Sequence, residues 1–144
     1  MKLKQIVSII QQILLGLEII HQSGYVHNDL KLENLMLQKR DEEGPRVLII
    51  DFGMTTEYLD ENGNHILKDE MEYFRGNLLF ASLSTLNFNR PSRKDDLISF
   101  CYLLLFLING CELPLFKSYC NSITQGSDNK MKCMKDFKKT HSLL

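Results

Sequence analysis

The stretch His-Asn-Asp-Leu-Lys-Leu-Glu-Asn at residues 27–34 decides the fold of this 144-residue chain, together with Asp-Phe-Gly at residues 51–53. The first stretch lies in a short polar segment, residues 25–34, which is predicted to be a loop. Neither stretch is diagnostic by itself. Asp-Phe-Gly is a common tripeptide that more often forms a turn than a metal site, and an isolated His-x-Asp is equally unspecific. The pair becomes specific only together with the elements predicted on either side of it.

An amphipathic helix is predicted before the polar loop and a hairpin after it. Between about residues 2 and 22, apolar side chains recur at helical spacing, at Ile6, Ile9, Ile10, Ile13, Leu14, Leu17 and Ile20. Gly24 can end this helix in a left-handed turn. Short apolar runs at 35–37 and 47–50 flank a turn-rich segment, which predicts a β-hairpin. Asp-Phe-Gly follows the second strand directly.

The remainder of the chain contains one strongly apolar helix. From 53 to about 89 no periodicity persists, which indicates a long ordered loop of functional type or a disordered segment. Residues 93–109 predict a helix that is apolar almost all round and therefore central and buried. Ser92 is a plausible cap for it. Further along, the chain turns lysine-rich, with a weak helical pattern near 128–138.

Composition excludes several classes of function. The length suits one compact domain, and a formal net charge of −1 with mixed charges gives no support to nucleic-acid binding. The apolar runs at 6–20 and 97–108 are too interrupted or too short for a bilayer, which requires ~20 apolar residues. We expect no signal peptide, because no charged, apolar and small-residue cleavage pattern is found at the first residues. Four cysteines without CxxC pairing favour reduced thiols. We therefore expect a cytoplasmic or nuclear protein without a membrane partner.

In this context the two stretches resemble a protein kinase. Residues 27–34 and 51–53 are similar to the catalytic loop H-R-D-L-x-x-x-N and its D-F-G partner. Gly-Asn-Leu-Leu-Phe-Ala-Ser at 76–82 and Pro-Ser-Arg-Lys-Asp-Asp-Leu at 91–97 are similar to segments of the casein kinase 1 family, G-T-x-R-Y-A-S and R-R-D-D-L-E-S. Glu-Leu-Pro-Leu-Phe at 112–116 is similar to its S-L-P-W.

The resemblance covers about residues 21–116 and implies a fold. That fold is α+β but mainly α, a kinase large (C-terminal) lobe with a small β-hairpin and no small lobe. Residues 1–116 would form the partial kinase domain, from the catalytic loop to the central helix. Residues 117–144 would form an incomplete end of the same lobe.

The resemblance also assigns chemical roles. Asp29 would accept or orient the proton of the attacking hydroxyl, and Lys31 would reach the γ-phosphate of ATP. Asn34 and Asp51 would hold Mg²⁺, an ion that prefers hard oxygen ligands. Met36 would lie under the adenine as an apolar floor. Phosphoryl transfer depends mainly on such positioning and charge neutralisation.

Support for the loop would come from the start of the central helix. Asp96 would accept backbone N–H bonds near His27, and Phe52 of the Asp-Phe-Gly segment, which ends at Gly53, would pack with His27 above it. The alternative is that Asp96 is an ordinary acid in a first helical turn, worth a few tenths of a kcal/mol. The anchoring role is favoured, because adjacent acids (Asp95 and Asp96) that begin an apolar helix need partners.

Three positions depart from the family pattern. Asn28 replaces the arginine that pairs with a phosphorylated activation loop in many kinases, so activation through that pair is not expected. Asn77 replaces the threonine expected to contact the catalytic aspartate. Leu79 replaces the arginine that helps this family read phosphorylated or acidic substrates, which puts such a preference in doubt.

Two main hypotheses follow, because the chain contains no Gly-rich loop and no V-A-I-K-like lysine. The first is a serine/threonine kinase of casein kinase 1 type, present as a truncated domain that uses ATP and Mg²⁺ on a protein substrate. The second is a catalytically inactive interaction module, with a partner covering the surface where a small lobe would dock. A third possibility is a fragment that does not fold alone.

Overall fold

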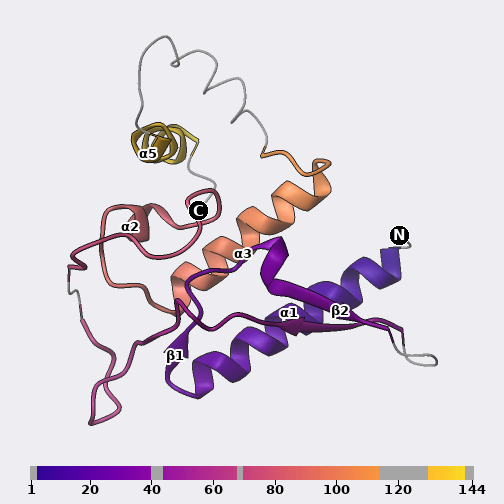
Figure 1. The fold of residues 1–144 in the computed structure, drawn as a ribbon, viewed down its shortest axis with the longest axis horizontal. Coiled ribbons are helices and arrows are strands. Elements are labelled where there is room, and N and C mark those ends of the chain that lie inside the picture. The colour runs from indigo at the N-terminus through magenta and orange to yellow at the C-terminus, as the bar shows by residue number, and fades with distance from the viewer. Residues whose placement is uncertain (1–2, 40–43, 68–69, 114–129, 142–144) are drawn as a thin grey trace.

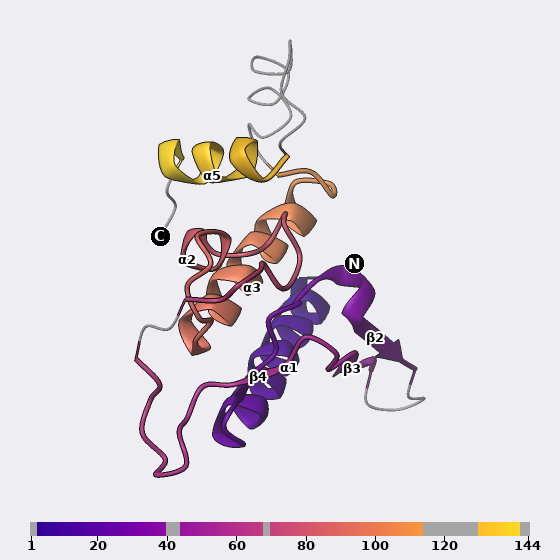
Figure 2. The ribbon, with the colours of Figure 1, turned by 60° about the vertical axis from the view of Figure 1, so that its left-hand side comes forward.

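The computed structural model describes residues 3–39, 44–67, 70–113 and 130–141. Figures 1 and 2 show the helices α1 and α3 next to each other and slanting the same way, with the hairpin on the side of α1 and α5 at the opposite end. In chain order, the elements are α1 (Leu3–Gln22), β1 (Tyr25–Val26), the 3₁₀ turn η1 (Leu32–Asn34), β2 (Leu35–Gln38), β3 (Arg46–Ile49), β4 (Thr56–Glu57), α2 (Leu83–Leu86), α3 (Arg93–Ile108) and α5 (Lys130–Thr140).

Helix α1 agrees with the predicted amphipathic helix. Ile13 and Leu17 are each 1% exposed, as expected for one apolar face. Gly24 follows the helix with φ +87°, the left-handed conformation predicted for its end. Ile13 and Leu17 belong to the same buried cluster as Phe100 and Leu103 of α3, so α1 and α3 share one core.

The predicted hairpin is confirmed as an antiparallel pair of β2 and β3, in the register Leu35↔Ile49 to Gln38↔Arg46. The expected turn falls partly on residues 40–43, outside the described residues. Gly16 allows the hairpin to lie close to α1, since a Cβ there would be 2.9 Å from Cδ1 of Ile49. Gln12 adds a polar link, because its Oε1 accepts a bond of 2.9 Å from the Val47 N–H.

The polar segment 25–34 was predicted to be a loop throughout. It instead includes the two-residue strand β1 and the 3₁₀ turn η1. Tyr25 pairs with Glu57 and Val26 with Thr56, which joins β1 to β4 in a second small ladder. Pairs this short leave no periodicity to detect in a sequence. Of the two alternatives for the segment after 53, the described part is an ordered loop with isolated bridges and the short helix α2.

Helix α3 forms where predicted and begins with a capping box between Ser92 and Asp95. The prediction that it is central and buried holds for most of the helix, since Phe100, Tyr102 and Leu103 belong to the core cluster, but not for all of its sides. Its Leu97 is 44% and its Ile108 72% exposed, although Leu103 is 0% exposed. A helix buries only the sides that neighbouring elements cover, and the described neighbours of α3 leave these two side chains open to solvent.

The weak helical pattern near 128–138 corresponds to α5, Lys130–Thr140. Its Met134 and Phe137 form a second buried cluster with Ala81 and Leu86. A mainly helical chain with a small hairpin is therefore confirmed. None of the helices in the described ranges combines the length and hydrophobicity that crossing a membrane would require.

Candidate active site

The polar loop is fixed by one buried carboxylate from the first turn of α3. Asp96 is 1% exposed. Its oxygens accept bonds from the backbone N–H groups of His27 at 2.8 Å and Asn28 at 2.9 Å. The Nε2 of His21, in the last turn of α1, lies 2.8 Å from the same carboxylate. These partners offset the cost of burying the charge, and the hydrogen bonds expected of Asp96 are present.

Two predicted site residues converge on Asp29, which is 5% exposed. The Lys31 ammonium lies 2.5 Å from Oδ2 of Asp29. The Asn34 amide donates to the Asp29 backbone carbonyl at 2.8 Å and to Oδ2 at 3.0 Å. The hydrogen bond to Asp29 raises the pKa of Lys31 above its usual value despite partial burial. The lysine therefore stays charged beside the carboxylate at neutral pH.

Asp51 lies beside this group because the hairpin returns there. The Ile50 N–H donates to the Asn34 carbonyl at 2.9 Å, one position beyond the Leu35↔Ile49 pair. Asp51 is exposed and adopts φ +64°, with Oδ1 accepting a bond of 3.2 Å from the Gly53 N–H. Asn34 Oδ1 and Asp51 Oδ2 accept no hydrogen bond from the described residues. Amide and carboxylate oxygens free in this way fit Mg²⁺.

His27 joins the two halves of the site. With its proton on Nε2, the ring donates to the Ile50 carbonyl at 3.2 Å while Nδ1 accepts the Asp29 N–H at 3.3 Å. Phe52 packs edge-on against the same ring, with centroids 5.4 Å apart at 67°. His27 is 0% exposed, and Phe52 is 54% exposed. The contact between the two residues is the one predicted.

Met36, predicted to lie under the adenine, is half exposed on β2 opposite Leu48. Its side chain is therefore open to solvent at the strand that follows Asn34. This exposure is compatible with an apolar surface for a ligand, and it leaves the role of Met36 a prediction.

Sequence reasoning missed what Asn28 does in the fold. Its Nδ2 donates to the Met54 carbonyl at 2.9 Å and to Thr56 Oγ1 at 2.8 Å, which ties the polar loop to the segment after Asp-Phe-Gly. Its own φ is +67°. Gly76 approaches it so closely that a Cβ would lie 2.2 Å from the Asn28 carbonyl oxygen. The glycine was visible in the sequence, but not the residue it contacts.

The departure at Asn77 has a local consequence. Its Oδ1 accepts bonds from the N–H groups of Leu79 at 2.9 Å and Phe80 at 3.3 Å, so the side chain closes its own turn. Among the described residues it makes no hydrogen bond to Asp29. His21 was also missed as a support, because nothing near it in the sequence points to Asp96.

Comparison with known proteins agrees with this geometry. The protein kinase domain family matches residues 1–142. The chain is 36% identical over 97 residues to a probable casein kinase I homolog from Encephalitozoon cuniculi, covering 67% of this chain and 29% of that protein. It is 35% identical over 97 residues to casein kinase 1-like protein HD16 from Oryza sativa subsp. japonica, covering 65% and 14%.

The chain therefore belongs to the protein kinase family. Within that family it is casein kinase 1-like, as the resemblance of residues 76–82 and 91–97 predicted. The aligned region spans less than a third of the length of either relative.

Proposed function

We propose that this chain is the large lobe of a serine/threonine kinase of casein kinase 1 type, which transfers the γ-phosphoryl group of ATP to a protein hydroxyl. The observation that carries the proposal is the convergence of Lys31 and Asn34 on the Asp29 carboxylate, with Asp51 next to Asn34. The spacing of these side chains across two loops matches what phosphoryl transfer requires, which is positioning and neutralisation of charge.

Each residue has a role in this proposal. Asp29 accepts or orients the proton of the substrate hydroxyl, with its carboxylate held by Asn34. Lys31 leaves Asp29 to contact the γ-phosphate, since its side chain is only partly buried. Asn34 Oδ1 and Asp51 hold Mg²⁺, which neutralises charge on the phosphates when bound. Met36 contacts the adenine from one side.

On its own, this chain should bind nucleotide weakly. The 144 residues hold no Gly-rich loop to cover the other side of the adenine. An uncovered face on the order of 100 Å² forgoes about 2.5 kcal/mol at ~25 cal/mol per Å². Such a loss is nearly a hundredfold in affinity. The proposal is therefore tested first by binding and then by turnover.

The binding test titrates the chain with ATP, with and without Mg²⁺, and follows backbone NMR shifts. We expect shift changes at Asn34 and Asp51 that require Mg²⁺. The affinity for ATP with Mg²⁺ should fall at least tenfold in Asp51→Asn. The matched control is Asp60→Asn, at an exposed aspartate whose carboxylate accepts bonds from the N–H groups of Asn62 and Asn64 in its own turn. Equal binding by both variants would remove Asp51 from the proposed metal site.

The turnover test joins the small lobe of a related kinase to this chain and measures phosphate transfer to casein. Asp29→Asn should lower the rate by about 10²–10⁴-fold, the usual contribution of a positioned acid–base group. Glu33→Gln, at an exposed carboxylate in the same loop, is the control. A hybrid in which Asp29→Asn leaves the rate unchanged would contradict the catalytic role.

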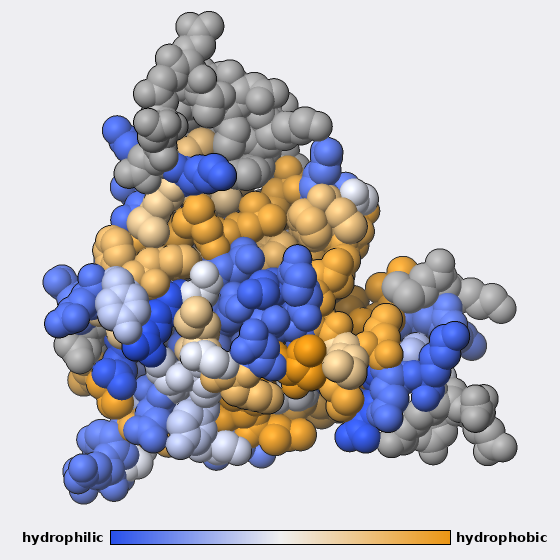
Figure 3. Space-filling view, in the orientation of Figure 1, coloured by the Kyte–Doolittle hydropathy of each residue, from blue (hydrophilic) through white to orange (hydrophobic). Residues whose placement is uncertain are grey.

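A second candidate function is a catalytically inactive interaction module, favoured by apolar side chains left open on one side. Leu15 and Ile19 of α1 are 57% and 65% exposed, close to the half-exposed Phe52. All three line a cavity of about 390 Å³ between α1 and the hairpin. Apolar residues reach the surface beside the hairpin in Figure 3. A patch of this kind favours a protein partner.

Light scattering with size exclusion tests the second candidate. The interaction module should self-associate or aggregate when purified alone, because its apolar surface lacks a cover. A clean monomer at high concentration would count against it.

A further inference from the structure

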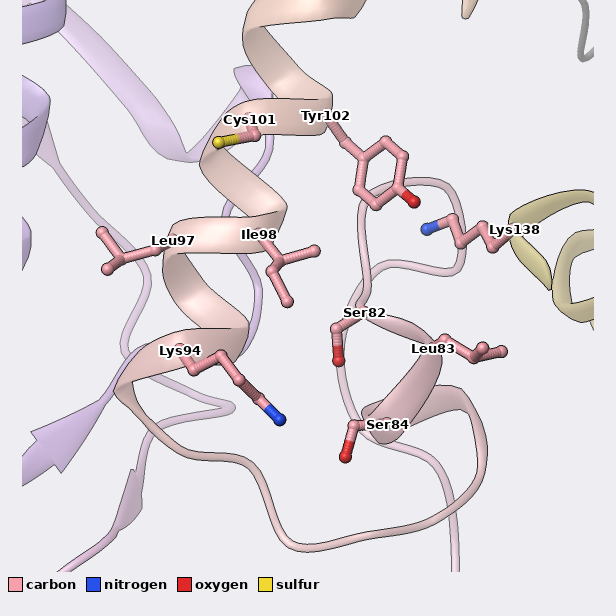
Figure 4. Close-up of a pocket in the computed structure, with 9 residues that line it drawn as sticks. All are labelled: Ser82, Leu83, Ser84, Lys94, Leu97, Ile98, Cys101, Tyr102 and Lys138. Carbon is pink, nitrogen blue, oxygen red and sulfur yellow. The ribbon is translucent and has the colours of Figure 1, made fainter. Parts of the chain in front are cut away.

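Lys138 of α5 is a buried lysine that the proposed chemistry does not use. It is 2% exposed, and its Nζ donates to the backbone carbonyls of Leu79, at 3.0 Å, and Ala81. The ammonium also lies 4.0 Å from the centre of the Tyr102 ring on α3. Figure 4 shows the amine pointing toward that ring from the opposite wall. Lysines are almost never fully buried unless they are paired.

The two carbonyls belong to a short segment, residues 77–82, that is fixed at both ends. At its start, Gly76 lies against the Asn28 carbonyl of the polar loop. At its end, Ser82 donates to the buried Asp95 carboxylate at 2.5 Å. Lys138 contacts the middle of the segment, between these two attachments.

The amine of Lys138 makes its contacts inside the protein. It lines a cavity of about 540 Å³ together with Lys94 and Ser84. Its ammonium, however, already faces two carbonyls and an aromatic ring, and this arrangement uses the three donors of a lysine. A substrate in the cavity would therefore meet the side chain of Lys94 rather than that of Lys138.

We propose that Lys138 is a positioning residue that holds segment 77–82 in place beside the catalytic loop, so that α5 shapes the surface presented to the protein substrate. The substrate-facing part rests on the proposed kinase function, whereas the positioning itself does not. The attachment is specific, because the neighbouring Lys139 is exposed and makes no such contact.

Amide hydrogen exchange on the full chain tests the positioning directly. The reporter amides are those of Leu79, Phe80 and Ala81, which all donate to Asn77 within the segment. In Lys138→Met we expect them to exchange about tenfold faster through local opening. Lys138→Arg, which keeps a buried cation with several donors, should restore most of the protection. Lys139→Met is the matched control and should leave it unchanged.

Two results would overturn the proposal. One is unchanged exchange at the reporter amides in Lys138→Met. The other is an equal acceleration in the buried turns of α1 around Ile13, because a uniform rise reports lost global stability and not a lost local attachment. If Lys138→Met does not fold, Lys138→Gln takes its place, and wild-type exchange in that variant also contradicts the proposal. Binding of ATP with Mg²⁺ by the wild-type chain, measured in parallel, tests the kinase function separately.

Discussion

The two halves of the candidate site are built in different ways. In residues 27–34, Asp29 and Asn34 are 5% and 4% exposed, and the backbone is held by the Asp96 carboxylate. In residues 51–54 every residue is exposed, with Phe52 at 54%. The polar loop therefore takes its shape from the interior of the fold. The Asp-Phe-Gly half is held by a few backbone bonds and one ring contact, so mutations there should change the unfolding free energy only slightly.

The largest effect is expected at Asp96. Asp96→Asn leaves the buried N–H groups of His27 and Asn28, and the His21 ring, with at most one good acceptor. Losing one partner of a buried charged network costs about 3–5 kcal/mol. Urea unfolding followed by circular dichroism measures the loss.

Glu61→Gln, at an exposed turn, is the control for Asp96→Asn and should change the unfolding free energy by less than about 0.5 kcal/mol. A loss at Asp96 as small as that would mean that the interior does not shape the loop. The contrast between the two halves of the site would then disappear.

A glycine comparison gives the next largest effect. Gly76→Ala puts a methyl group 2.2 Å from the Asn28 carbonyl and forces φ +109° on alanine. We expect the unfolding free energy to fall by about 2–4 kcal/mol, from left-handed strain and overpacking together. Gly63→Ala is the matched control, since its φ is +75° but nothing lies within 4 Å. It should lose about 1 kcal/mol, from strain alone. Equal losses in urea unfolding would show that the catalytic loop yields to the methyl group.

A third region, around Lys138 of α5, differs from both halves of the site in that its contribution to the unfolding free energy should depend on pH. Burial lowers the pKa of Lys138 from 10.5 to about 7. Between these values the unfolded chain binds more protons than the folded one. The unfolding free energy should therefore rise with pH, by at most about 1.4 kcal/mol per unit. Burial raises the pKa of the facing Tyr102 hydroxyl, so this group acts in the opposite sense above pH 10.

Urea unfolding of wild type and Lys138→Met at pH 7, 8 and 9 isolates the contribution of Lys138. Tyr102 faces the amine from α3, and Lys94 lines the same cavity, so both stay in place in the variant. We expect the difference between the two proteins to grow with pH in favour of wild type. A constant difference would mean that Lys138 stays charged throughout this range.

The smallest effect is expected at Phe52. Phe52→Ala removes the ring contact with His27, but more than half of the side chain is already in water. An aromatic pair contributes about 0.5–1.5 kcal/mol, so the loss should be about 1 kcal/mol or less. A loss as large as that of Asp96→Asn would show that the exposed half of the site is built into the core after all.

Periodicity predicted the long elements, and the family resemblance predicted the anchor. The helices at 3–22 and 93–108 and the hairpin follow from apolar spacing. The resemblance assigned the loop near His27 to Asp96, and the need of a buried acid for partners favoured that role. Contacts set by chain segments far apart could not be predicted. His21 meets Asp96 across 75 positions, and β1 is too short for any pattern. A lysine-rich stretch predicts a solvated surface. Lys138 is nevertheless buried, and its amine donates to backbone carbonyls 59 and 57 positions away in the chain.

The anchoring of the loop has a consequence for biosynthesis. The amide groups of His27 and Asn28 obtain their partner from a carboxylate 69 and 68 positions further along the chain. At roughly 5–20 residues per second, a ribosome needs on the order of 3–14 s to add the intervening residues. Until then, the emerging loop lacks its native hydrogen-bond acceptor. The polar loop is synthesised well before its anchor, so a nascent chain released before Asp96 carries the motif without its geometry.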